Sequence, residues 1–129
     1  MTGHHQPLGE HDPLGQAIAA AIEAFDAGNH AWGRYLHYVL RPYRSEHPEA
    51  PSPVRVRAAL REAALSVPHS REREELRAFY NALLLARRAL RDFIAALPDP
   101  LRTADLLMAP DAFAEAMTYL EPWIGDDLR

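Results

Sequence analysis

Side chains that favour β-strands are scarce in this chain of 129 residues. It holds four Val, four Ile and three Thr, against 23 Ala and 17 Leu. Alanine and leucine are among the best helix formers, whereas β-branched residues are enriched in strands. We therefore expect an all-α fold, a compact bundle of five or six helices around one long central helix over residues 71–97.

Three dipeptides that typically begin helices occur along the sequence. In each, a side chain that can accept a hydrogen bond from a helix-start amide precedes a proline, which has no amide to leave unbonded. The dipeptides are Asp12-Pro13, Ser52-Pro53 and Asp99-Pro100. With the spacing of the apolar residues, they predict helices over 13–27, 30–41, 53–66, 71–97, 100–108 and 111–121. Because no Gly- or Pro-rich linker separates two cores, we expect a single domain over residues 13–129, after a mobile arm over residues 1–12.

Three residues are expected to shape the N-terminal part as a helical hairpin. Gly28 is a favoured helix stop, and Asn29 can cap a new helix directly after it. Pro42 is expected to end that second helix, because the residue before a proline avoids the α-helical conformation. So short a connection would make the helices over 13–27 and 30–41 antiparallel neighbours.

The longest predicted helix carries a heptad pattern. Apolar side chains alternate spacings of three and four over three heptads, as in the seam of a coiled coil. The seam consists of Leu76, Phe79, Leu83, Ala86, Leu90, Phe93 and Leu97. Four further side chains widen the apolar face to that of a bundle core, namely Tyr80, Leu84, Leu85 and Ile94. The two interpretations are compatible, and we expect the chain to self-associate through helix 71–97.

Charge is distributed unevenly along the chain. The formal net charge is −4 for residues 1–33, +6 for residues 34–91 and −6 for residues 92–129. Such asymmetry favours a binding function. The arginines expected to form the binding surface are Arg34, Arg41, Arg73, Arg77, Arg87, Arg88 and Arg91, with Arg55, Arg57 and Arg61 on the preceding helix. This surface would suit an acidic protein or, alternatively, nucleic-acid phosphates, unless the acidic flanks neutralise it within the fold.

The sequence offers little for catalysis. The absence of cysteine excludes a disulfide scaffold, a thiolate zinc site and a cysteine nucleophile. One helix face could support acid–base cleavage of a phosphodiester, through His30, Arg34, His37 and Arg41. Carboxylate pairs or a histidine-rich arm could hold a metal, namely Glu23 with Asp26, Glu72 with Glu75, and His4, His5 and His11 with Asp12. Solvated helix faces and an unstructured arm are the simpler interpretations, so we expect no catalytic residue, metal site or cofactor.

These observations favour a binding protein over an enzyme. We expect a non-enzymatic interaction or accessory subunit that forms homo-oligomers and binds a protein partner. The alternative is a nucleic-acid-binding subunit that uses the arginine-rich surface of residues 34–91. The sequence begins with no readable secretory signal and contains no apolar run of the roughly 20 residues that a membrane span needs. We therefore expect a cytoplasmic protein without a membrane partner.

Overall fold

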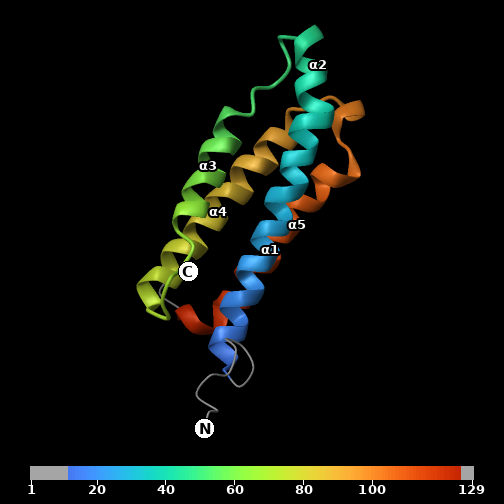
Figure 1. Ribbon diagram of the computed structural model, residues 1–129. Helices are drawn as coiled ribbons and strands as arrows, with labels where there is room; N and C mark the ends of the chain where they lie inside the picture. Colours follow the sequence, from blue (N-terminus) through green and yellow to red (C-terminus); the bar gives the residue numbers. More distant parts are fainter. Residues whose placement is uncertain (1–11, 126–129) are drawn as a thin grey trace.

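The computed structural model describes residues 12–125, and every regular element in this range is helical (Figure 1). The elements are α1 (Pro13–Tyr35), the π-helical turn η2 (Leu36–Leu40), α2 (Arg41–Glu46), α3 (Val54–Leu65), α4 (Arg73–Ala95), the 3-10 turn η3 (Asp99–Leu101) and α5 (Ala104–Ile124). Because α1, η2 and α2 follow one another without a break, they form one long helical rod. Together with α3, α4 and α5, the described residues therefore form four long helical segments. The all-α prediction is confirmed, with fewer and longer helices than expected. The predicted arm lies outside the described residues, apart from Asp12.

The four helical segments run alternately in opposite directions along one long axis (Figure 1). Helix α5 packs against both α1 and α4, and α3 packs on α4. The loop before α3 and the connection before α5 both lie at the end of the bundle opposite the start of α1. The centre of the bundle is thus shared between α4 and α5, whereas the sequence suggested α4 alone.

The predicted hairpin at Gly28 is wrong, because α1 continues straight through it. Gly28 is buried where α1 meets α5, and a β-carbon built on it would lie 2.5 Å from Cε1 of Phe113. The missing side chain therefore allows two helices to approach closely, instead of ending one of them. A glycine required by packing and a glycine required by a turn look the same in a single sequence.

Pro42 does not end its helix either. It lies in the first turn of α2, directly after the π-helical turn η2. At the end of that turn the amide of Arg41 bonds the carbonyl oxygen of Leu36, five residues back. A proline removes one helical hydrogen bond and crowds the carbonyl four residues before it. The wider π turn accommodates this, so the helical rod continues to Glu46.

The two short helices predicted over 100–108 and 111–121 are in fact one helix, α5. Its N-cap is Thr103, whose hydroxyl accepts a hydrogen bond from the amide of Leu106 at 3.4 Å, and Asp99 begins only the short turn η3. Pro110 lies inside α5 and is buried together with Ala109. Packing on both sides of this helix outweighs the hydrogen bond that the proline removes.

Other predicted boundaries are confirmed. Asp12 caps α1, with Oδ1 accepting from the amide of Gly15 at 3.0 Å. Helix α3 begins close to the predicted residue, but its N-cap is Pro53, and Ser52 accepts from the amide of Val54 at 3.3 Å from one residue further back. The long predicted helix over 71–97 is observed as α4 and is unbroken.

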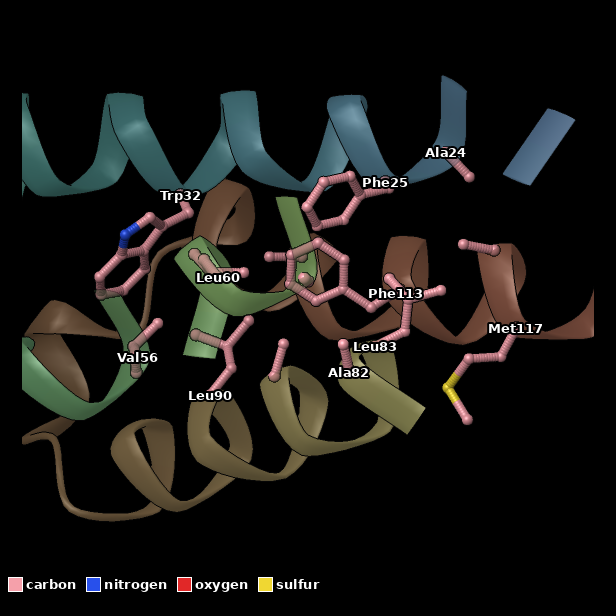
Figure 2. Packing of buried hydrophobic residues seen from close by; sticks show 14 of the residues in the cluster. Ala24, Phe25, Trp32, Val56, Leu60, Ala82, Leu83, Leu90, Phe113 and Met117 are labelled. Atoms are coloured by element: carbon pink, nitrogen blue, oxygen red, sulfur yellow. The ribbon is translucent and has the colours of Figure 1, made fainter. Parts of the chain in front are cut away.

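All seven seam residues, six of them in α4 and Leu97 just after it, lie in the core of a single chain. Their side chains are between 0% and 6% exposed, and Leu83 and Leu90 point into the bundle interior in Figure 2. Phe79 meets Phe25 of α1 edge-to-face, with ring centroids 5.5 Å apart, and Phe93 meets Trp32 in the same way at 5.4 Å. The heptad side chains thus form part of the intramolecular core.

Candidate functional site

The seven arginines predicted as a binding surface do not lie together. Arg73 and Arg77 belong to the first turns of α4, near the end where α1 begins. Arg34 and Arg41 lie at the far end of the long rod, and the remaining three, Arg87, Arg88 and Arg91, lie in the second half of α4. Because α1 and α4 run in the same direction, the last two groups share one end of the bundle (Figure 1).

This end of the bundle is strongly basic, and we call it the basic end, comprising residues 34–61 and 87–102. These two segments contain ten of the fourteen arginines, against four acidic side chains, Glu46, Glu49, Asp92 and Asp99. They meet because the up-and-down topology brings the end of α1–α2, the start of α3 and the end of α4 to the same place. In the sequence these arginines lie in separate segments, and the fold brings the segments together at one end of the bundle.

Several of these arginines are used within the chain. Arg34 pairs with Asp105 of α5 at 3.3 Å. Arg102 pairs with Asp99 at 3.1 Å and donates to the carbonyl oxygens of Ile94 and Ala95 in the last turn of α4. The expected internal neutralisation therefore applies to part of the surface.

Other arginines at the basic end have no such partner. Within residues 12–125, no hydrogen bond or ion pair joins them to another side chain or to the backbone; they are Arg44, Arg55, Arg57, Arg61, Arg87, Arg88 and Arg91. The Nε atoms of Arg44 and Arg87 are even buried without an acceptor. A buried donor without a partner is costly to stability.

Three arginines line a cavity of about 350 Å³ between η2–α2 and the start of α3. Arg41 and Arg44 come from α2 and Arg57 from α3, while the remaining walls are Leu36, Leu40, Ser45, Pro48 and Pro53. No carboxylate lines the cavity. Arg41 donates to Nδ1 of His37 at 3.5 Å, and Ser45 donates to the carbonyl oxygen of Pro42. Three arginines beside apolar walls make this cavity, which we call the arginine pocket, a candidate site for an anion.

A second depression lies between α4 and α5 at the same end. It has a volume of about 610 Å³ and is lined by Arg91, Ile94, Ala95, Arg102, Leu107 and Pro110. Leu107, which lines this depression, is 45% exposed. An apolar surface bordered by guanidinium groups, which we call the α4–α5 groove, is suited to an apolar side chain flanked by carboxylates.

Within the described residues, the side chains considered for catalysis or metal binding are not arranged as a site. Arg34 is paired with Asp105 and Arg41 with His37, and His30 is an exposed residue outside both depressions. Glu75 accepts the amides of His69 and Ser70 at 2.7 and 3.1 Å, so its carboxylate holds the loop before α4. In the described part of the chain, no three His, Asp or Glu side chains are grouped as metal ligands. Residues His4, His5 and His11 lie outside it.

Arg44 is the one arginine of this pocket that is not among the arginines predicted for the binding surface, which include Arg41 and Arg57. Ending the helix at Pro42 separates Arg44 from Arg41, whereas the continuous rod presents both on one face. The spacing of three between these arginines was the available signal, and the predicted proline break concealed it. That Arg57 lies opposite them depends on where α3 packs, which is not a local property of the sequence.

Among residues 12–125, no helix combines the length and the apolar character that spanning a bilayer requires. No protein-family model, no curated protein and no solved structure matches the chain.

Proposed function

We propose that this protein is a non-enzymatic interaction or accessory subunit that binds an acidic protein segment at its basic end. The observation that carries the proposal is the gathering of ten arginines at one end of the bundle, several of them without an internal partner. An overall net charge of −4 makes so basic an end a local feature, and charge complementarity of this kind steers partners and fixes their orientation. The proposed location is the cytoplasm.

The α4–α5 groove is the proposed contact on this end. Arg88 and Arg91 are exposed on α4, and Leu107 and Met108 of α5 are 45% and 62% exposed. An acidic amphipathic helix could place an apolar side chain against Leu107 and carboxylates near the arginines. A nucleic acid fits less well, because single strands are bound by stacking on aromatic rings, and none lines this groove.

The test compares two polyanions of different chemistry. A poly-glutamate peptide and a single-stranded RNA with the same number of charges are titrated against the protein in 50 mM and 200 mM salt, with fluorescence anisotropy as the measurement. We expect the peptide to bind and the double variant Arg88→Gln/Arg91→Gln to bind it ~2- to 30-fold more weakly, from roughly 0.2–1 kcal/mol for each exposed charge pair.

Arg77→Gln is the control, because Arg77 lies at the other end of α4. Equal weakening by the control variant would show a diffuse charge effect and contradict the proposed contact. Binding of the RNA in preference to the peptide would replace the acidic protein partner with a nucleic acid, and the salt dependence would then count the phosphates bound.

We also propose that the chain self-associates, through the outer face of α4 rather than through its heptad positions. Leu85 on α4 is 59% exposed and Leu65 on α3 is 72% exposed. Between these helices lies a depression of about 380 Å³, largely walled by alanines, with lining residues Ala58, Ala59, Glu62, Ser66, Ala78, Asn81, Ala82 and Leu85. Small side chains let another helix approach closely, and exposed leucines reward its burial.

Light scattering at micromolar and submillimolar concentrations tests this self-association. We expect a mass above that of the 14.5 kDa chain, reduced to the monomer by Leu85→Glu. Met108→Glu is the matched control, because Met108 is equally exposed but lies on α5. A monomeric wild-type protein, or the same mass for Leu85→Glu as for the wild type, would contradict the proposal.

A further inference from the structure

The arginine pocket combines three arginines with mostly apolar walls. Its volume of about 350 Å³ falls in the range of small-molecule sites, roughly 300–1,000 Å³. Arg41, Arg44 and Arg57 enter it from two different helices, and no acidic side chain lines it. We propose that this pocket binds a small phosphate monoester that carries an apolar or aromatic group.

The charge of the ligand follows from the arginines. Arg44 and Arg57 make no ion pair within the described residues, and the buried Nε of Arg44 has no acceptor there. A guanidinium group donates two parallel hydrogen bonds to a phosphate, with a geometry that a lysine cannot reproduce. Three such groups favour a doubly charged phosphate monoester over a singly charged carboxylate.

The apolar part of the ligand follows from the floor of the pocket. Leu36 and Leu40 belong to the π-helical turn, and Pro48 and Pro53 bound the loop before α3. Leu40 and Pro53 are buried, whereas Leu36 is partly buried and Pro48 is exposed. Inorganic phosphate alone would leave the accessible parts of Leu36 and Pro48 uncovered. A ring or a short alkyl chain attached to the phosphate would cover these two side chains.

The π-helical turn connects this pocket to Pro42. Turns of this kind are rare and occur often at functional sites. Here the turn keeps the helix intact across the proline, so that Arg41 and Arg44 stay on one helix face. The inference concerns a ligand distinct from the acidic segment proposed above, and it holds whether or not a protein binds the α4–α5 groove.

Isothermal titration calorimetry with phenyl phosphate tests the inference. Inorganic phosphate and phenol serve as partial ligands, and all titrations use the full chain in 50 mM salt. We expect phenyl phosphate to bind at least tenfold more tightly than inorganic phosphate, and phenol not to bind. Arg44→Gln and Arg57→Gln should each weaken phenyl phosphate at least tenfold.

Arg61→Gln is the matched control, since Arg61 lies one turn further along α3, is exposed and does not line the pocket. Thermal unfolding of each variant establishes that it is folded. Arg57 is exposed, so its variant tests the pocket even if Arg44→Gln fails to fold. We expect Arg61→Gln to bind as the wild type does.

Three results would overturn the inference. The first is no binding of phenyl phosphate at millimolar concentration. The second is equal weakening by Arg57→Gln and Arg61→Gln, which would indicate a diffuse field and no pocket. The third is tight binding of a single-stranded RNA by a protein that ignores phenyl phosphate. Failure of the poly-glutamate titration would contradict the proposed function and leave this inference standing.

Discussion

Some single residues in this bundle lower its folding stability, and the rest of the fold compensates for them. The clearest is Tyr35, which is 1% exposed and whose hydroxyl is buried without a hydrogen-bond partner in the described structure. Burial raises the pKa of Tyr35 to about 12, so the phenol is neutral at any physiological pH. A neutral but unpartnered hydroxyl is still unfavourable in the core.

Removing that hydroxyl should therefore stabilise the protein. We expect Tyr35→Phe to raise the free energy of unfolding by about 1 kcal/mol, because the ring packing stays and the unbonded group is lost. Urea denaturation measures the change. Tyr38→Phe, at a residue that is 72% exposed, should stay within about 0.5 kcal/mol of the wild type. A clear loss of stability for Tyr35→Phe would mean that the hydroxyl has a partner after all.

Glu75 makes the opposite contribution, because its carboxylate satisfies two loop amides. The hydrogen bonds from His69 first and Ser70 second hold the pKa of Glu75 below its ordinary value of 4.5. A carboxyl whose pKa is lowered by folding stabilises the protein above its unfolded pKa. That contribution is lost as the pH falls through the lower, folded value.

The pH dependence of Glu75→Gln tests this reasoning. We expect a lower melting temperature than wild type at pH 7, and a difference between the two that shrinks as the pH falls below about 4.5. Glu74→Gln is the control, because the neighbouring Glu74 is exposed. A melting-temperature difference that stays constant from pH 7 to pH 3 would contradict the role of the Glu75 charge.

At the scale of elements, the long rod of α1, η2 and α2 distinguishes this fold from the predicted hairpin. Two glycines of α1 have opposite surroundings. A β-carbon on Gly28 would meet the buried ring of Phe113, whereas one on Gly33 would meet nothing within 4 Å. The same substitution at these two positions should therefore have opposite effects.

Gly28→Ala should destabilise the protein by about 1–3 kcal/mol, because the added methyl group overpacks the contact between α1 and α5. Gly33→Ala should stabilise it by about 0.5–1 kcal/mol, since alanine is the better residue in an exposed helix interior. Chemical denaturation of both variants is the measurement. Stabilisation by Gly28→Ala would mean that the two helices are further apart than described here.

The helical class and several boundaries could be predicted because they depend on local properties. Composition determines the class, and the cap formed by Asp12 acts within three residues. The continuity of helices through Gly28, Pro42 and Pro110 could not be predicted, because packing between distant segments outweighs local preference there. The location of the arginine pocket could not be predicted for the same reason, since Arg57 lines the same cavity as Arg44 only in the folded arrangement.

At the scale of the whole molecule, the bundle has an apolar interior and a basic end. The heptad side chains of α4 are buried against α1, α3 and α5 of the same chain. The surface available to partners therefore consists of the arginines and the exposed leucines outside the core. If this division is correct, a core substitution on α4 weakens the single chain and leaves every contact between chains unchanged.

The most direct measurement is the unfolding free energy of Leu90→Ala over a hundredfold range of protein concentration. Leu90 is completely buried, and truncating such a leucine costs about 2–5 kcal/mol. We expect a loss of this size that is the same at every protein concentration. A loss that grows or shrinks with concentration would place Leu90 between two chains, and would contradict the assignment of the heptad face to the interior of one.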